Sequence, residues 1–534
     1  MTGPGRPVGG GAGPERGAGA GAGGRRPAGA PVDVLVIGGG PAGTTVASLL
    51  ARAGRRVTLL ERETFPRYHI GESLAPSART VLALTGALDA VERGGHQDKR
   101  GVRFTWSLDE WIIDWNALGN GTRSWQVDRS RFDEQNLRNA AAQGVEVIEG
   151  AQVKRVLFDG PRAVGAEWLG RPAARAAGAP GAAAPGAGAP AAGVTCAGAA
   201  GGPAARVADA GTAEVRRVAA RFVVDASGRS GLISAQHLLN RRRHPDFENT
   251  AVWGYWTGAR IRPGAPMGAL TAVATPHGWW WLIPLADGRL SLGYVTRKTA
   301  FQAGRQQAES LPAYYLERLA ASPAVAEVVA DAALVSPIRA EQDYSYVADT
   351  FSGPGWASTG DAACFLDPLL STGVHLAQYS ALTLAAALVS TLDGEVPEAE
   401  ALRFFELAYR RAYCRLLVLT ARLYQTYDGQ DRYFGQAEQL LDPNALGPVP
   451  LRNFAEIVTG ASDLREAQAT GDRVRTATLL REAEAAQDAA RERGTADGSG
   501  LDFSALREFA PGEDEGSGLY LITRPTVRLA RRTG

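Results

Sequence analysis

Three glycines near the start of the chain occur at the spacing that binds the pyrophosphate of a dinucleotide. An apolar run at residues 34–37 leads into Gly-Gly-Gly-Pro-Ala-Gly at 38–43, and a helical pattern follows over 44–53. In such a turn the first glycine permits a tight bend, the second lets the backbone approach the pyrophosphate and the third allows close helix packing. The helix N-terminus then faces the negative charge. The residues expected to bind are Gly38, Gly40, Pro41, Ala42 and Gly43.

A carboxylate follows at the end of the next predicted strand. Residues 57–60 form a second apolar run that ends at Glu61. This is about the spacing expected for an acid that accepts hydrogen bonds from ribose hydroxyls. A glycine-rich loop without a ligand is the alternative, and the position of Glu61 favours the dinucleotide. The pattern predicts an α/β fold with a Rossmann-like domain.

A stretch of consecutive tryptophans is the second place where residue type suggests chemistry. Trp279, Trp280 and Trp281 are three of the 11 tryptophans in the chain, and Pro284 follows them. Indole rings are large and rigid and carry one donor, so the cluster suits the wall of a cavity. A buried aromatic strand is the alternative. In an extended segment Trp279 and Trp281 face one side and Trp280 faces the other.

Three further segments carry a resemblance to a known superfamily. Asp225-Ala-Ser-Gly follows an apolar strand, and Thr-Gly-Asp361-Ala follows another. Both segments, together with residues 125–133, resemble motifs of the FAD-dependent aromatic hydroxylases. The resemblance spans most of residues 32–440. It implies FAD as the cofactor, with Asp361 at its ribityl chain and Arg129 on the flavin side.

Four separated pieces resemble flavin-dependent halogenases more closely. They are Phe-Pro-Arg-Tyr-His-Ile-Gly-Glu-Ser-Leu-Ala-Pro at 65–76, Asp-Lys-Arg-Gly-Val-Arg-Phe at 98–104, the Trp-x-Trp-x-Ile-Pro pattern at 279–284, and Phe-Leu-Asp-Pro-Leu-Leu-Ser-Thr-Gly-Val at 365–374. By these pieces, which occur in the family's order, the chain is identified as a member of that family. The resemblance implies a halogenase that uses reduced FAD (FADH2), O2 and chloride.

The halogenase resemblance assigns roles to particular residues. It implies that backbone N–H groups of Thr372 and Gly373 bind the halide, at the start of a predicted helix over 375–392, where the helix dipole assists. Simple helix capping by Ser371 or Thr372 is the alternative. The resemblance also implies that the halide is oxidised to hypohalous acid and that Lys99 receives and aims it, either through a hydrogen bond or as a chloramine. Taken alone, Lys99 would be an exposed surface charge.

The tryptophans receive a role by the same reasoning. Bulky rings between flavin and substrate would suppress direct hydroxylation, so Trp279 and Trp281 are expected to be buried at a cavity between the FAD sheet and the substrate region. An FAD-dependent aromatic monooxygenase that hydroxylates its substrate is the competing function, because a shared fold does not fix the activity. That alternative explains neither the tryptophan stretch nor Lys99.

One position bears on the substrate. Halogenases of free tryptophan carry a glutamate immediately before Ser-Thr-Gly, whereas this chain has Leu370. The resemblance is closer to halogenases of phenols or pyrroles, many of which act on rings tethered to a peptidyl-carrier protein. A tyrosine-like phenol is the first choice and a pyrrole the second. Because no NAD(P)H site is recognisable, a separate flavin reductase is expected to supply FADH2.

Composition narrows the remaining classes of function. The 534 residues carry a formal net charge of +1 and no basic patch with interleaved aromatics, so nucleic acid is not expected as a partner. Residues 1–30 lack an apolar core segment and the chain has no run of about 18 apolar residues, so neither a signal peptide nor a membrane span is expected. Cys196, Cys364 and Cys414 are too scattered for disulfides or a metal site and favour the cytoplasm.

The chain divides into a tail, an interleaved body and a C-terminal region. Residues 1–30 are expected to be a disordered tail, and 31–395 to be the FAD-binding domain interleaved with a substrate-binding sheet. A low-complexity insert at 171–205 is expected to separate two arms of a hairpin, residues 163–168 and 214–218.

The region 396–534 is expected to be helical. Its stretch 463–493 is expected to be a solvated, charged helix. Four aromatic residues of this region are expected to lie near the substrate entrance: Tyr424, Tyr427, Tyr433 and Phe434.

Overall fold

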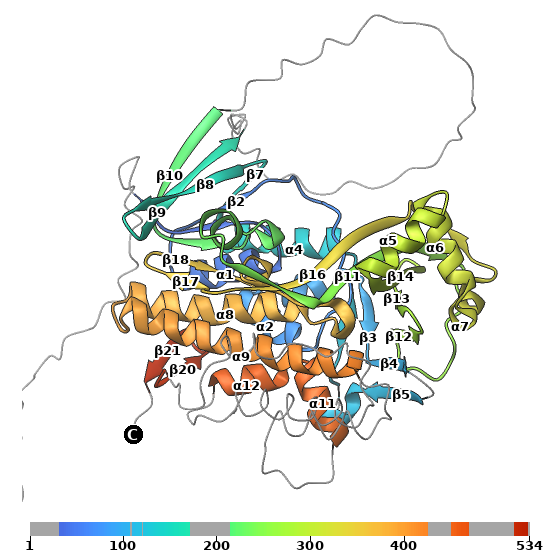
Figure 1. Cartoon of the computed structure of the whole chain (residues 1–534). Helices are drawn as coiled ribbons and strands as arrows, with labels where there is room; N and C mark the ends of the chain where they lie inside the picture. The colour runs from blue at the N-terminus through green and yellow to red at the C-terminus, as the bar shows by residue number, and fades with distance from the viewer. Residues whose placement is uncertain are drawn as a thin grey trace, which may run out of the picture.

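The computed structural model describes residues 31–106, 109–119, 121–170, 214–425, 450–468 and 517–531. The expectations about the tail at 1–30, the insert at 171–205, and Tyr427, Tyr433 and Phe434 lie outside these ranges. Figure 1 gives the course of the chain, in which a sheet with helices and a second sheet lie beside a helical layer.

The first sheet contains the parallel strands expected of a dinucleotide-binding domain. Its order is β17-β18-β10-β1-β2-β7, and β1 pairs in parallel with both β10 and β2. Val34, Leu35 and Val36 are fully buried, because helices and other layers cover both faces of such a sheet. The α/β, Rossmann-like fold class is confirmed. The strand bounds are β1 (Val32–Ile37), β2 (Val57–Glu61), β7 (Glu146–Glu149), β10 (Glu214–Asp225), β17 (Ser352–Gly353) and β18 (Trp356–Ser358).

The two arms that flank the insert pair as expected. Strand β9 (Arg162–Gly170) runs antiparallel to β10, with Trp168 opposite Arg216, and β8 (Gln152–Asp159) pairs with the other edge of β9. Helices α1 (Pro41–Arg52) and α4 (Arg129–Ala142) pack on each other beside this sheet, and α2 (Ser77–Thr85) and α3 (Leu88–Glu92) follow the second strand.

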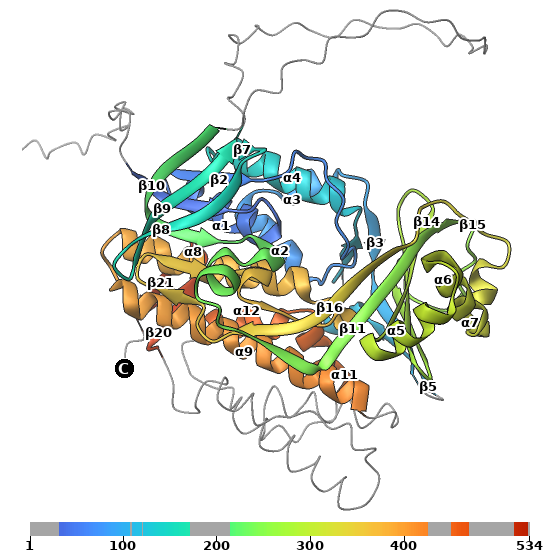
Figure 2. The same cartoon turned by 45° about the horizontal axis from the view of Figure 1, so that its top comes forward.

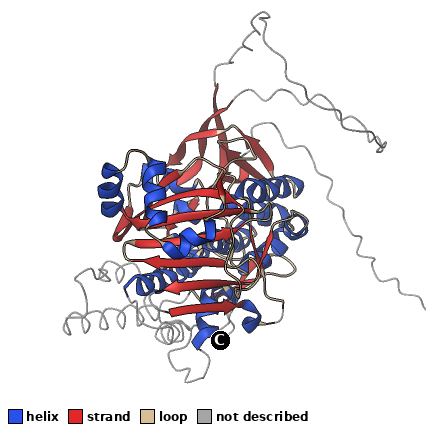
Figure 3. Ribbon diagram, turned by 90° about the vertical axis from the view of Figure 1, so that its right-hand side faces the viewer, coloured by secondary structure: helices blue, strands red, loops and turns tan. Residues whose placement is uncertain are grey.

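A second sheet carries the tryptophan stretch. Its order is β19-β16-β11-β14-β13-β12-β4-β5, with the short β15 (Ala333–Leu334) on β11, and Figure 3 views the molecule from this side. Figure 2 shows β11 and β16 as long neighbouring strands that run toward helices α5, α6 and α7. The other bounds are β4 (Gly101–Trp106), β5 (Asp109–Asp114), β11 (Arg241–Thr257), β12 (Leu270–Thr275), β13 (Gly278–Pro284), β14 (Arg289–Arg297), β16 (Arg339–Ala348), β19 (Cys364–Phe365), α5 (Lys298–Gln307), α6 (Leu311–Ala320) and α7 (Pro323–Ala326).

The alternation of strand β13 separates its three indoles. Trp279 and Trp281 join the main core, whereas Trp280 packs against Tyr294 and Tyr315 in a second core under helices α5 to α7. All three rings are buried. The expected burial of Trp279 and Trp281, and the opposite orientation of Trp280, are therefore confirmed.

The C-terminal region forms a helical layer with a small hairpin. Helices α8 (Gly373–Leu392) and α9 (Glu398–Gln425) lie side by side, and α11 (Pro450–Val458) and α12 (Ala461–Gln468) pack beneath them (Figure 1). Strands β20 (Leu519–Ile522) and β21 (Arg528–Arg531) pair antiparallel, so the region after 395 is not wholly helical. Among the described helices, α8 alone is long and apolar enough to cross a membrane, but 94% of that apolar stretch is buried inside the protein.

The expectation of a solvated helix from residue 463 is wrong at its first residue. Asp463 in α12 is 1% exposed, and its carboxylate pairs with Arg415 of α9 and with His375 of α8. The charged pattern of α12 reads as solvent-facing in isolation. The buried arginine that complements it comes from a helix far away in the sequence.

Candidate active site

The glycine-rich turn has the geometry of a pyrophosphate cradle. Gly38 adopts φ +108, and a Cβ added there would lie 2.3 Å from the carbonyl oxygen of Ala226. At Gly43 an added Cβ would lie 1.9 Å from the Gly38 carbonyl oxygen. Helix α1 begins at Pro41, and no side chain caps it, so its first N–H groups are available to an anion.

Glu61 holds the turn as well as facing the expected ribose site. Its Oε2 accepts a hydrogen bond from the Gly39 N–H at 2.6 Å, and its Oε1 accepts one from the Glu63 N–H at 2.8 Å. A carboxylate oxygen has two acceptor sites, so both oxygens can still accept from a hydroxyl. The expected ribose contact is compatible with this geometry.

A buried arginine that the sequence analysis did not assign lies at the start of helix α1. Arg67 Nη2 is 3.6 Å from the Cβ position of Gly40, and Arg67 Nη1 is buried with no hydrogen-bond partner among the described residues. Its charge is only partly balanced by Asp133 at 3.4 Å. A guanidinium with one free Nη1 beside a helix N-terminus fits the pyrophosphate of FAD. The segment 65–76 that contains Arg67 was recognised by its resemblance to halogenases, but no local pattern identified Arg67 as a cofactor contact.

Arg129 and Asp361 approach each other from different elements. Arg129 forms two hydrogen bonds of 2.9 Å to Asp133 and donates to the Ile70 carbonyl at 2.8 Å. Burial raises the pKa of Asp361, and the neighbouring Arg229 and Arg129 counteract that rise. Each of the two charges thus influences the other, as expected if both border the flavin and its ribityl chain.

We expect Gly43→Ala to weaken FAD binding by at least about tenfold. The added methyl would overlap the backbone of Gly38, which cannot move without reshaping the turn, and overpacking of this kind costs about 1–3 kcal/mol. FAD fluorescence titration measures the effect. Gly54→Ala is the matched control: its Cβ meets open space at φ +77, so it should lower stability without changing FAD affinity.

The segment 65–76 links this cradle to Lys99. At its far end the Ser73 hydroxyl accepts a hydrogen bond of 2.7 Å from Lys99 Nζ, and the Leu74 carbonyl accepts a second of 3.2 Å. The lysine ends β3 (Gln97–Lys99), which pairs with β6 (Ser124–Gln126). Because one short segment contacts both regions, it fixes the lysine relative to the dinucleotide site.

Lys99 is buried in a strongly apolar setting. It is 2% exposed, and its ammonium lies 4.7 Å from the ring centre of Trp115. Burial lowers the pKa of Lys99 to about 7. The sequence alone favoured an exposed charge, and the structure instead places an amine that exchanges its proton near neutral pH.

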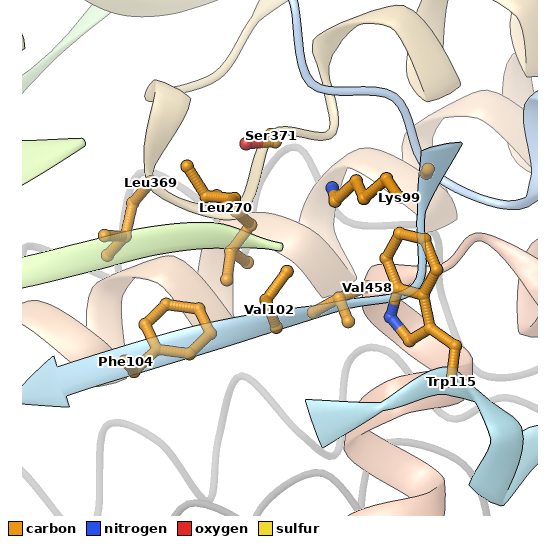
Figure 4. Close-up of a pocket in the computed structure, with 10 residues that line it drawn as sticks. Lys99, Val102, Phe104, Trp115, Leu270, Leu369, Ser371 and Val458 are labelled. Atoms are coloured by element: carbon orange, nitrogen blue, oxygen red, sulfur yellow. The ribbon is translucent and has the colours of Figure 1, made fainter. Parts of the chain in front are cut away.

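Lys99 lines a pocket together with the loop that precedes helix α8. In Figure 4 its side chain points toward Ser371, and Trp115 lies beside it. Trp115, rather than Trp279 or Trp281, is the indole at this pocket, and nothing in its sequence context predicted that. The described lining residues are Ala75, Lys99, Val102, Phe104, Trp115, Leu270, Leu369, Leu370, Ser371 and Val458.

The loop before α8 has an unsatisfied polar group. Ser371 adopts a left-handed φ of 56, and Thr372 follows as the N-cap of α8 without a capping hydrogen bond from its side chain. The Thr372 hydroxyl is buried and has no partner among the described residues, and a Cβ at Gly373 would meet open space. Simple capping by the Thr372 side chain does not account for this arrangement.

Trp279 and Trp281 each donate a hydrogen bond through the indole N–H. The Trp279 Nε1–H donates to the Tyr424 hydroxyl at 2.7 Å, and that hydroxyl lies 3.0 Å from Asp367 in the same loop. Trp281 Nε1–H donates to the Ser291 hydroxyl at 3.2 Å. Tyr424, expected near the substrate entrance, thus connects the tryptophan strand to the loop before α8.

The fold and the site together combine a dinucleotide-binding turn with a buried lysine. The family model described as tryptophan halogenase matches residues 33–124 and 194–453. Similar proteins include a tryptophan 2-halogenase of Chondromyces crocatus, 38% identical over 82% of this chain and 77% of that protein, and the sulochrin halogenase gedL of Aspergillus terreus, 35% identical over 73% and 69%. The myxobacterial chondrochloren halogenase CndH has a similar structure, with a TM-score of 0.63 and 31% identity over 81% of this chain and 96% of that one.

The chain belongs to the tryptophan halogenase family, and it is a flavin-dependent halogenase. It uses reduced FAD with halide and O2, and a separate flavin reductase supplies the reduced cofactor. When bound, reduced FAD would supply the two electrons that activate O2 to oxidise the halide. The competing function, hydroxylation of an aromatic ring, is thereby set aside.

Proposed function

We propose that this halogenase chlorinates an electron-rich phenol, such as a tyrosyl ring, that a carrier protein delivers. The observation that carries the proposal is the chemistry of the pocket. Among its described lining residues Lys99 alone is ionisable, and Leu370 occupies the wall. A free amino acid would bring an ammonium and a carboxylate that need partners when buried. An acyl group bound to a carrier as a thioester has no free carboxylate.

Within this proposal Thr372 and Gly373 hold the halide. The unpartnered Thr372 hydroxyl and the N-terminus of α8 offer donors without a full positive charge. Such a site binds chloride and also releases it for oxidation. The FAD contacts proposed are the glycine-rich turn, Glu61, Arg129 and Asp361, with Arg67 added at the pyrophosphate.

Lys99 then receives the hypohalous acid and aims it at the ring. With a pKa of about 7 both forms of the amine are present near neutral pH. The ammonium can donate a hydrogen bond to the oxidant, and the neutral amine can form a chloramine; both routes use the same geometry. Trp279 supports the site indirectly through Tyr424 and Asp367.

An indole is the second candidate ring, because the relative from Chondromyces crocatus is a tryptophan 2-halogenase. A pyrrole remains a third.

We also propose a cytoplasmic location, since Cys364 and Cys414 are free thiols and structural disulfides are rare in the cytoplasm.

Mass spectrometry of a matched substrate panel tests the proposal. The assay contains the protein, FAD, NADH, a flavin reductase, chloride and O2, with tyrosyl and pyrrolyl groups each offered free and carrier-bound, and free tryptophan. We expect the chlorine isotope pattern on the carrier-bound tyrosyl group. Preferential chlorination of free tryptophan would show that the substrate is an indole rather than a phenol. Chlorination of free tyrosine at the same rate as the carrier-bound group would show that no carrier protein is needed.

A further inference from the structure

We infer that Tyr68, Tyr255 and Glu72 form a proton path that joins solvent to the interior between the flavin-binding residues and Lys99. The inference depends on the halogenase activity and not on which ring is halogenated. It therefore goes beyond the proposed substrate and can be tested separately.

The three side chains form a continuous chain of hydrogen bonds. Tyr68 is 45% exposed, and its hydroxyl lies 3.1 Å from the hydroxyl of Tyr255. The Tyr255 hydroxyl donates to Glu72 Oε1 at 2.6 Å. Tyr255 and Glu72 are both buried, so the chain runs from the surface into the protein.

The direction of the hydrogen bonds is set by the neighbours. Trp253 Nε1–H donates to the Tyr68 hydroxyl oxygen at 2.7 Å. Because Tyr255 gives its single proton to Glu72, Tyr68 must donate to Tyr255. All hydroxyl protons then point inward, which is the arrangement needed to pass a proton from water to the carboxylate in one concerted relay.

The inner end of the chain lies between the two functional regions. Glu72 Oε2 is buried without a hydrogen bond of ordinary geometry. The Ser291 hydroxyl, which accepts from Trp281 Nε1–H, is near enough to lower the pKa of the carboxyl, so it marks the inner end of the path. In the sequence Glu72 lies between Gly71 and Ser73. The Gly71 carbonyl accepts a hydrogen bond from Arg129 at 3.2 Å, and the Ser73 hydroxyl accepts one from Lys99. Burial raises the pKa of Glu72 to about 7, so it can exchange a proton at neutral pH.

Charged groups surround the path without blocking it. Asp128 raises the pKa of Glu72, while Arg129 lowers it. Arg289 lies 5.1 Å from the ring centre of Tyr255, and Arg339 lies 4.4 Å from that of Tyr68. Burial raises the pKa of both phenols, and Arg339 offsets only part of that rise at Tyr68. A concerted transfer therefore suits the path, because neither tyrosine has to carry a full negative charge.

The reaction requires such a supply. In halogenation FADH2, O2, chloride, an aromatic C–H and one proton give FAD, the aryl chloride and two waters. The flavin is oxidised, O2 is reduced to water, and a C–Cl bond replaces the C–H bond. One proton therefore enters from solvent in each turnover, and the buried site needs a route for it.

Tyr255→Phe tests the path by breaking it at its middle. We expect kcat to fall by about 10-fold to 100-fold, at the lower end of general acid–base effects, with unchanged FAD affinity and with partial rescue by imidazole as a diffusible proton carrier. Tyr314→Phe is the matched control, because it removes another buried hydroxyl from the far core and should leave kcat unchanged. Wild-type turnover in Tyr255→Phe, or a loss that imidazole does not relieve, would overturn the inference.

Infrared spectroscopy of the full chain with FAD bound gives a readout that needs no turnover. A protonated carboxyl band that titrates near pH 7 is expected in the wild type, should be absent from Glu72→Gln, and should shift in Tyr255→Phe. An identical titration in Glu72→Gln would contradict the path. Failure of the phenol proposal would change the halogenated product and leave these spectra as they are.

Discussion

Lys99→Met is expected to abolish halogenation and, at the same time, to stabilise the protein below neutral pH. The variant keeps the length of the side chain and removes the amine. FAD binding and peroxide production should persist, because the FAD contacts lie on other residues, while chlorinated product should fall by about 100-fold or more. Product analysis by mass spectrometry and a peroxide assay on the same samples measure both quantities.

The stability gain follows from the pKa of the buried amine. In the unfolded chain the lysine stays protonated up to its ordinary pKa of 10.5, whereas in the folded protein its pKa is about 7. Wild-type stability is therefore lost as pH falls from 10.5 toward 7, by up to about 5 kcal/mol. The variant escapes that loss, so its advantage should be largest at pH 6 and small at pH 10.

Urea unfolding at several pH values tests this prediction. Lys154→Met is the control, since Lys154 is exposed on β8 and should change stability little at any pH. A Lys99→Met variant that still chlorinates normally would remove Lys99 from the chemistry. A stability difference that does not depend on pH would show that the amine is not held in the neutral form.

Arg415→Met is expected to destabilise the protein by about 3–5 kcal/mol, because it leaves buried carboxylates without their cation. Arg415 and Asp463 are each 1% exposed and paired, and Arg415 also pairs with Glu466. His375 Nε2 lies 2.8 Å from Asp463, and its Nδ1 lies 2.8 Å from the Ser77 hydroxyl. The network thus joins α9, α12, α8 and α2.

The same network supports the pocket. The Ser77 N–H donates to the Thr459 carbonyl at 3.0 Å, and the adjacent Val458 lines the pocket. The midpoint of urea unfolding measures the loss. Arg465→Met removes an exposed arginine of α12 that pairs with Glu456 of α11, and it should cost about 1 kcal/mol or less. Equal losses of stability in the two variants would show that the buried Arg415 pair contributes no more to the free energy of unfolding than an exposed pair does.

The dinucleotide-binding turn could be predicted from the sequence, because each of its requirements is local. Gly38 and Gly43 are needed by backbone geometry within a single turn, and Glu61 follows one strand later. Lys99 was placed only by family resemblance, since its burial depends on Trp115 and Ser73, which come from different elements. No local sequence pattern predicts that these residues come into contact.

Other features were missed because they arise from long-range pairing. Asp463 reads as a solvated charge until Arg415 is brought against it. Trp279 and Trp281 were expected to wall the cavity, yet neither is among the described residues that line the pocket. The alternation of β13 predicted which face they share, and the partner of Trp279, Tyr424, comes from a helix 145 positions away.

We propose that the halogen reaches the phenol ring at the Lys99 pocket without passing through bulk solvent. The most direct test is to chlorinate the carrier-bound tyrosyl group with and without excess methionine, which scavenges free hypochlorous acid, and to measure the yield by mass spectrometry. We predict a yield of chlorinated product that methionine does not reduce. A yield that methionine abolishes would contradict transfer in the pocket, because it would mean that the oxidant escapes and reacts in solution.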